Sequence, residues 1–113
     1  MDIITALSMH RRLQHIDFEY NLLRNNGCIA MATLLQHSVT QLQVLDLGSN
    51  EVEDEGIDAL VPALKSCRDL KTLRLCDNPS ITSRGWQHLA SILDDPNSNL
   101  MELNLTNNFF DIG

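Results

Sequence analysis

The segment LQVLDLGSNEVEDEGIDALVPALKSCRD, from Leu42 to Asp69, contains the pattern that decides the fold. Similar segments start at Leu13, Leu70 and Leu100, so the unit recurs every 28 to 30 residues along nearly all of the 113-residue chain. Repeats of this length are typical of solenoids, in which each unit buries its apolar face against its neighbours. The sequence therefore predicts a stack of similar units.

Each unit begins with a strand pattern. Large apolar residues occupy relative positions 1, 4 and 6, and positions 4 and 6 alternate with other residues as in a short strand. These residues are Leu13, Ile16 and Phe18, then Leu42, Leu45 and Leu47, then Leu70, Leu73 and Leu75, then Leu100, Leu103 and Leu105. An asparagine follows at position 9 of every unit, as Asn21, Asn50, Asn78 and Asn108.

A helix pattern completes the unit. Gly27, Gly56 and Gly85 each lead into apolar residues spaced i, i+3, i+4 and i+7, which form one face of an amphipathic helix. The three faces are Cys28, Met31, Ala32 and Leu35; Ile57, Leu60, Val61 and Leu64; and Trp86, Leu89, Ala90 and Leu93. Two residues before each glycine stand Asn25, Asp54 and Ser83, which are typical N-cap residues. We expect their side-chain oxygens to accept hydrogen bonds from amides at the start of their own helices.

Two prolines depart from the common unit. Pro79 follows Asn78, and Gly85 lies 7 residues after that asparagine where the preceding units have 6, which predicts a bulged loop. Pro62 lies inside the second helix pattern, and because proline lacks an amide hydrogen we expect it to kink or loosen that helix.

The combined pattern, LxxLxLxxN followed by a glycine and a helix with a period near 29, resembles the ribonuclease-inhibitor-like class of leucine-rich repeats. The resemblance covers essentially the whole chain. It implies an α/β leucine-rich repeat solenoid, a right-handed β-α superhelix with a parallel concave sheet and outer helices. It also implies that Asn21, Asn50, Asn78 and Asn108 form a ladder of hydrogen bonds to loop backbone. A turn buried between repeats leaves amides without water, and each amide needs a partner.

Length and composition predict one leucine-rich repeat domain over residues 1–113, with a partial helix at 1–12 and repeats from 13, 42, 70 and 100. No complete capping repeat is visible. Hydrophobic residues make up 43% of the chain and aromatic residues 4%, so leucine packing must form the core. Two interpretations remain open. The chain is a piece of a longer solenoid, or its exposed ends associate, as a homodimer joined through Leu100 to Leu105 or the apolar residues Phe109, Phe110 and Ile112.

The sequence has no apolar run of about 18 residues that could span a bilayer, and its start does not resemble a signal peptide. Cys28, Cys67 and Cys76 are odd in number and show no CxxC spacing, which favours structural thiols in a reduced compartment. We therefore expect a cytoplasmic protein without a membrane partner.

Strand residues between the buried leucines should point to the open concave side, because successive side chains alternate faces. The candidate partner-binding residues are His15, Asp17, Glu19, Tyr20, Val44, Asp46, Thr72, Arg74, Cys76, Glu102 and Asn104. With Asp77 on the rim, this surface carries five acids and one base, and the whole chain has 15 acidic and 8 basic residues and a formal charge of −7. Such a surface predicts a basic protein partner and disfavours nucleic acid. The alternative is that these acids only solvate the surface.

Neighbouring strands lie about 4.8 Å apart, so Asp17, Asp46 and Arg74 should be adjacent in one row across the sheet. We expect Arg74 to neutralise Asp46 in part. Tyr20 and Arg74 are the preferred anchors for a partner, because aromatic and arginine side chains dominate interface hot spots.

The sequence predicts no enzyme, no cofactor and no metal site. The histidines lack partners at metal-ligand spacing, and Cys76 and His15 should lie about 10 Å apart, too far for activation of a nucleophile. We expect a protein-protein interaction module with an acidic concave surface. The alternatives are a regulatory leucine-rich repeat segment of a GTPase-activating or innate-immune-receptor-like protein, which rests on fold analogy, and a purely structural solenoid segment.

Overall fold

The computed structural model describes residues 14–37, 41–106 and 108, in which strands and helices alternate. The elements are β1 (His15–Asp17), α2 (Arg24–His37), β2 (Val44–Asp46), α3 (Asp54–Ser66), β3 (Thr72–Arg74), α4 (Ser83–Ala90) and β4 (Glu102–Asn104). The expected helix at 1–12 and the apolar residues Phe109, Phe110 and Ile112 lie outside the described residues. α3 runs through Pro62 to Ser66, so this proline does not end the helix.

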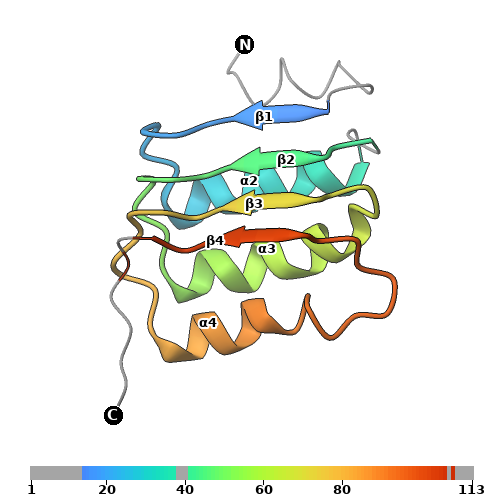
Figure 1. Cartoon of the computed structure of the whole chain (residues 1–113). Helices are drawn as coiled ribbons and strands as arrows, with labels where there is room; N and C mark the ends of the chain where they lie inside the picture. Colours follow the sequence, from blue (N-terminus) through green and yellow to red (C-terminus); the bar gives the residue numbers. More distant parts are fainter. Residues whose placement is uncertain (1–13, 38–40, 107, 109–113) are drawn as a thin grey trace.

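The four strands form one parallel sheet in the order β1-β2-β3-β4. Residues at the same position of successive repeats pair directly, as Ile16 does with Leu45, Leu45 with Leu73, and Leu73 with Leu103. The helices α2, α3 and α4 lie together on one face of this sheet, and the other face carries no helix formed by the described residues (Figure 1). The chain is thus an α/β leucine-rich repeat solenoid, as the repeat pattern predicts.

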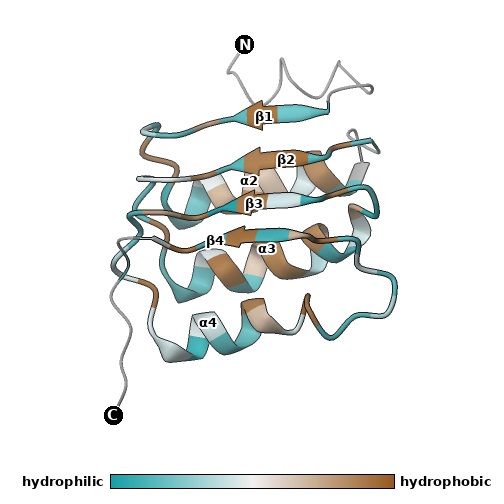
Figure 2. Cartoon of the chain, in the orientation of Figure 1, coloured by the Kyte–Doolittle hydropathy of each residue, from teal (hydrophilic) through white to brown (hydrophobic). Residues whose placement is uncertain are grey.

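The core lies between the sheet and the helices. Leu45 and Leu73 at the strand centres are 0% exposed, and apolar segments recur in each strand and along α2 and α3 (Figure 2). The predicted apolar faces of α2 and α3 are buried in full. The face predicted for the third helix is partly wrong, because Ala90 is exposed and Leu93 is 56% exposed. α4 ends at Ala90, and the turn that follows brings Ile92 into the core instead.

None of the helices within residues 14–37, 41–106 and 108 has the length and apolar character that crossing a lipid bilayer requires.

Asparagine side chains link the loops that follow the strands. The backbone N–H of Asn21 donates to Oδ1 of Asn50 at 2.9 Å, that of Asn50 to Oδ1 of Asn78 at 3.1 Å, and that of Asn78 to Oδ1 of Asn108 at 2.6 Å. The side-chain amide of Asn50 also donates to the carbonyls of Phe18 and Gly48, each at 2.9 Å. Asn50 and Asn78 are 0% exposed, so these side chains replace water for the buried loop backbone.

A second set of contacts joins each repeat to the next at the helix starts. Oδ1 of Asn25 accepts the backbone N–H of Glu53 at 3.2 Å, and Oδ1 of Asp54 accepts that of Thr82 at 2.8 Å. Glu53 and Thr82 are the N-cap residues of α3 and α4, and their own side chains make no capping hydrogen bond. The prediction that Asn25 and Asp54 cap their own helices is therefore wrong. Each one satisfies an amide at the start of the following repeat's helix.

This contact explains the glycines of the helix pattern. A Cβ atom at position 85 would overlap Oδ1 of Asp54 and would lie 2.7 Å from Cγ2 of Ile81. A Cβ at position 56 would lie 2.8 Å from Oδ1 of Asn25. Glycine is needed at both positions because a polar side chain of the preceding repeat reaches over the helix backbone.

The loops between strands and helices contain residues with left-handed backbone. Tyr20, Ser49 and Asp77 occupy the same repeat position, just before the ladder asparagine, and have φ values of 63°, 55° and 57°. Leu22 and Glu51, just after it, have φ values of 50° and 54°. Pro79 takes that position in the third repeat and cannot adopt a positive φ, because its ring fixes φ near −65°. The third loop must therefore follow a different path.

Candidate functional site

The concave face is the helix-free face of the sheet. Strand register places His15, Val44, Thr72 and Glu102 in one row across it and Asp17, Asp46, Arg74 and Asn104 in the next. Of the candidate residues, His15, Asp17, Tyr20 and Glu102 are exposed; Glu19, Val44, Thr72, Arg74, Cys76 and Asn104 are half-buried; and Asp46 is buried. The fold thus brings residues from four repeats onto one surface.

Three acidic side chains meet at the end of this face where β1 and β2 finish. One carboxylate oxygen from each of Asp17, Glu19 and Asp46 lies within 4.8 Å of the other two. Gly48 makes room for this acidic triad, because a Cβ at position 48 would lie 3.1 Å from Oε2 of Glu19 and 3.2 Å from Oδ1 of Asp46. The close approach of three like charges is unfavourable unless a cation is nearby.

Two members of the acidic triad also have a local structural role. Oδ1 of Asp17 accepts the backbone N–H of Glu19 at 3.2 Å, and Oδ1 of Asp46 accepts that of Gly48 at 3.0 Å. Asn104 makes the same bond to the N–H of Thr106 at 3.1 Å. Such bonds to the residue two positions ahead are typical of Asx turns and favour the end of a strand. One oxygen of each aspartate is therefore used by its own loop.

The structure shows that Asp46 is more buried than expected and that the neighbouring Arg74 forms its ion pair with another acid. Asp46 is only 9% exposed, because it lies on an inner strand between the side chains of its two neighbours, Asp17 and Arg74. Arg74 does not form its ion pair with Asp46: its Nε lies 3.8 Å from Oε1 of Glu102 on β4. Among the described residues, none of the three acids in the triad has an ion pair. The strand order offers Arg74 an acid on either side, and in the structure it contacts the more exposed one.

The electrostatics of the acidic triad affect Glu19. Loss of solvation raises the pKa of the Glu19 carboxyl above its usual 4.5, and the negative charges of Asp46, Asp17 and Asp77 raise it further. Arg74 acts in the opposite direction. A positive charge close to Glu19 would therefore stabilise its ionised carboxylate.

Tyr20 lies beside the triad at the rim of the concave face. Its side chain is 73% exposed, and its backbone has a φ of 63°. The N–H of Tyr20 donates to the carbonyl of Gly48 at 3.0 Å, which holds the loop to the neighbouring repeat. A large aromatic side chain is thus presented to solvent from a backbone fixed by hydrogen bonds.

The acids of this face can bind a cation or a cationic side chain. The acidic triad brings together one oxygen from each of three side chains, whereas Ca²⁺ takes about six to eight oxygen ligands, so three such single contacts would be half of a coordination sphere at most. The Cys76 thiol donates to the carbonyl of Asn104 at 3.8 Å, on the side of the sheet away from β1. His15 lies on β1, with β2 between it and β3. The geometry does not pair this thiol with a base.

One charged cluster joins α3 to α4 and is not part of the sequence prediction. Nη1 of Arg84 donates to both carboxylate oxygens of Asp58, at 2.9 and 3.2 Å, and Nδ1 of His88 lies 2.9 Å from Oδ1 of the same residue. The hydrogen bonds from Arg84 and His88 lower the pKa of Asp58. In the sequence, this cluster is indicated by an acid, Asp58, and a base, Arg84, that are separated by about one repeat period.

Comparison with known proteins agrees with this architecture. A family model described as Leucine Rich repeat matches residues 40–61. The chain belongs to the leucine-rich repeat proteins, whose repeats are in general non-catalytic modules for binding other proteins. Among solved structures, the actin-binding site 2 of leiomodin-1 superposes with a TM-score of 0.77 at 18% sequence identity, covering 93% of this chain and 60% of that one. At that identity the likeness concerns the fold.

Curated relatives are much longer proteins. The chain is 36% identical over 99 residues to human NACHT, LRR and PYD domains-containing protein 13, covering 88% of this chain and 9% of the relative. It is 42% identical over 84 residues to mouse NACHT, LRR and PYD domains-containing protein 12, covering 73% and 8%. It is 24% identical over 90 residues to RAN GTPase-activating protein 2 of Arabidopsis thaliana, covering 80% and 16%. The chain spans less than a fifth of the length of these relatives.

Proposed function

We propose that this chain is a protein-binding module whose concave face receives a basic segment of a partner protein. The observation that carries the proposal is the acidic triad, in which the carboxylates of Asp17, Glu19 and Asp46 lie within 4.8 Å of one another without an ion pair among the described residues. A lysine or arginine side chain of the partner would relieve this repulsion. Buried acids gain more from such a partner than fully hydrated ones, and Asp46 is 9% exposed.

The rest of the concave face supports the same partner. Glu102 and Asp77 extend the negative surface, and the one positive side chain among the candidates, Arg74, is engaged with Glu102 at 3.8 Å. An acidic face attracts a basic surface over a distance and raises the association rate more than the final affinity. Tyr20 at the rim then supplies apolar contact area, which charge alone does not provide.

The proposal is tested with a lysine- and arginine-containing peptide titrated into the protein at low and at physiological salt. The double substitution Asp17→Asn with Glu19→Gln should weaken binding severalfold, and added salt should weaken binding to the wild type. The charge-matched control is Glu55→Gln with Asp94→Asn, two exposed acids that lie outside the concave face. Equal losses in both double variants would mean that only net charge matters and would contradict the proposal.

The same titration identifies the ligand of the acidic triad. Excess calcium ions are added in a second series, and binding is followed by calorimetry. Tight calcium binding that Asp17→Asn abolishes would assign the triad to a metal ion and not to a basic side chain. Weak competition, similar to that of an equal ionic strength of sodium chloride, is the result that the proposal requires.

A second candidate is self-association through the last described strand. β4 (Glu102–Asn104) lies at the edge of the described sheet, and Leu100, Leu103 and Leu105 are only partly buried, in contrast to the equivalent leucines of the second and third repeats. Exposed edge strands favour pairing with another chain. Light scattering over a range of concentrations tests this candidate, and a constant monomer mass would contradict it.

The relatives suggest the larger setting in which such a module would act. We infer a leucine-rich repeat region like those of the NACHT, LRR and PYD domains-containing proteins, because identities to three of them are 36%, 42% and 33%. Identity to the RAN GTPase-activating protein is 24%. An assay of GTP hydrolysis by Ran with and without this chain separates the two settings. Stimulated hydrolysis would favour the GTPase-activating alternative.

A further inference from the structure

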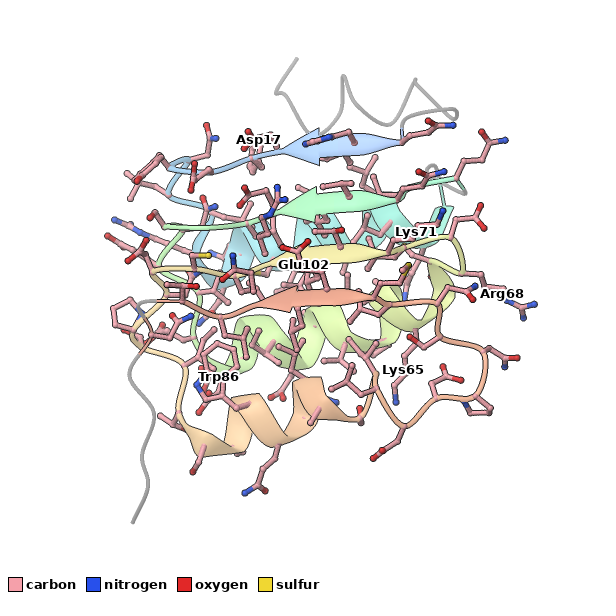
Figure 3. All side chains as sticks on the ribbon, in the orientation of Figure 1. Asp17, Lys65, Arg68, Lys71, Trp86 and Glu102 are labelled. Carbon is pink, nitrogen blue, oxygen red and sulfur yellow. The ribbon has the colours of Figure 1, made fainter. Side chains whose placement is uncertain are left out.

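Three exposed basic residues lie at the side of the sheet where the strands begin. Lys65 is in the last turn of α3, and Arg68 and Lys71 are in the turn between α3 and β3. All three side chains are on the same side of the molecule, away from Asp17 at the end of β1 (Figure 3). The chain has 8 lysines and arginines. Two of these, Arg11 and Arg12, lie outside the described residues, so the cluster holds three of the remaining six.

These three cations differ from the other described ones in their pairing. Arg24, Arg74 and Arg84 each lie within 4.0 Å of a carboxylate. Within residues 14–37, 41–106 and 108, no carboxylate approaches Lys65, Arg68 or Lys71 that closely.

Acids are nevertheless close by in the sequence and in space. Asp69 is in the same turn, and Asp95 lines a shallow crevice together with Lys65. Oδ1 of Asp95 accepts the backbone N–H of Asn97 at 2.9 Å. The three cations thus have acids in their neighbourhood but no ion pair among the described residues, in a chain whose net charge is −7.

A structural role explains only one of the three. Lys65 lies at the C-terminus of α3, where a positive charge interacts favourably with the helix dipole. That interaction fades within the last turn, so it does not account for Arg68 and Lys71 beyond the helix. The carbonyl of Arg68 accepts a hydrogen bond from Nδ2 of Asn99 at 2.7 Å, which fixes the backbone and leaves the side chain exposed.

We infer that Lys65, Arg68 and Lys71 form a basic edge that binds an acidic segment of a protein. Clustered cations at a surface attract and orient a chain of opposite charge. A protein segment fits this edge better than a nucleic acid, because binding to a duplex depends on many lysine and arginine contacts along a continuous line of phosphates. Three cations can make only a few such contacts, which suits a short acidic segment better than a long, uniformly charged backbone. This surface is separate from the concave face, so a partner touching both would be held in one orientation.

The test uses a fluorescent polyglutamate peptide titrated into the whole chain at low salt. The double substitution Arg68→Gln with Lys71→Gln should raise the Kd about two- to thirtyfold, which is the combined effect expected of two exposed charge pairs. The charge-matched control, Arg24→Gln with Arg84→Gln, should leave the Kd within about twofold of wild type, because its residues lie at the starts of α2 and α4, away from the basic edge. Circular dichroism melting of each variant confirms that it remains folded.

Three results would overturn the inference. The first is that the wild type does not bind polyglutamate at low salt. The second is that the control variant loses as much affinity as the edge variant. In the third, a single-stranded oligonucleotide of the same charge binds more tightly than polyglutamate and loses affinity in the edge variant. That last result would assign the edge to phosphate groups. Because the concave-face experiment uses a basic peptide and different residues, either proposal can fail without the other.

Discussion

Replacing Asn50 by alanine tests the hydrogen bonds that join neighbouring repeats. The side chain of Asn50 is 0% exposed and makes four hydrogen bonds. Its Oδ1 accepts the N–H groups of Asn21 at 2.9 Å and Leu23 at 3.1 Å, and its Nδ2 donates to the carbonyls of Phe18 and Gly48 at 2.9 Å each. All four partners are backbone groups. They stay in place when the side chain of Asn50 is truncated, but they lose the hydrogen bonds that it made.

The expected loss follows from what remains unpaired. The carbonyl of Gly48 keeps a second donor, the N–H of Tyr20 at 3.0 Å, and is not left without a partner. The N–H of Leu23 and the carbonyl of Phe18 lose buried hydrogen bonds, and the N–H of Asn21 loses a half-buried one. A buried polar group left unpaired costs about 1 to 3 kcal/mol, so we expect the free energy of unfolding to fall by about 3 kcal/mol. Total stability of a domain is typically about 5 to 15 kcal/mol.

Urea denaturation followed by circular dichroism measures this loss, with the wild type and Asn21→Ala melted alongside. Asn21 is the matched control because it occupies the same repeat position but is exposed, and its side-chain amide donates only to the carbonyl of Glu19 within the described residues. We expect the control to lose less than about 1 kcal/mol. A loss for Asn50→Ala below about 1 kcal/mol, or equal to that of the control, would refute the assignment of a structural role to the ladder.

Three further predictions concern a helix start, the concave face and the thiols. Gly85→Ala should lower stability by about 1 to 3 kcal/mol, because its Cβ would overlap Oδ1 of Asp54, and combining it with Asp54→Gly should recover part of the loss in a double-mutant cycle. Glu19→Gln should raise the melting temperature at pH 7. The pKa of Glu19 is higher in the folded than in the unfolded chain, so its contribution to stability is present below the unfolded pKa and is lost as pH rises through the folded pKa. At pH 7 the ionised carboxylate therefore destabilises the fold, and the neutral glutamine removes that charge. The gain should therefore vanish below about pH 4, and a gain independent of pH would contradict this origin. Cys76 is half-buried and should react fastest with a thiol reagent. Burial raises the pKa of Cys28 to about 12 and that of Cys67 to about 11, so these two thiols should react more slowly. Three equal rates in the folded protein would contradict the described burial.

Much of the fold could be predicted from the sequence, because the same requirements for burial and hydrogen bonding recur in four repeats. Leu45 and Leu73 recur at one position, and a single register puts both at 0% exposure between the sheet and the helices. Asparagine at position 9 recurs for a similar reason, since each buried loop contains amides that need an acceptor. Periodicity thus determined the parallel sheet, its pairing and the buried faces of α2 and α3.

The sequence failed where the answer depended on the neighbouring repeat. Asn25 and Asp54 have the residue types of N-caps, but their oxygens reach Glu53 and Thr82 one repeat further on. Local spacing could not distinguish these alternatives, because the start of the residue's own helix and the start of the next helix are both close to the side chain.

By itself, the sequence determined the repeat, the direction of the strands and the set of residues that share the concave face. Only the tertiary structure decided that Arg74 contacts Glu102, that Asp46 is 9% exposed, and that Lys65, Arg68 and Lys71 lie on one side of the molecule without an ion pair to another described residue. The physical reason is that these features depend on different parts of the structure. Burial of leucines depends on a period that every repeat contains, whereas the pairing of a charge depends on side-chain positions that differ between repeats and are fixed only after the repeats stack.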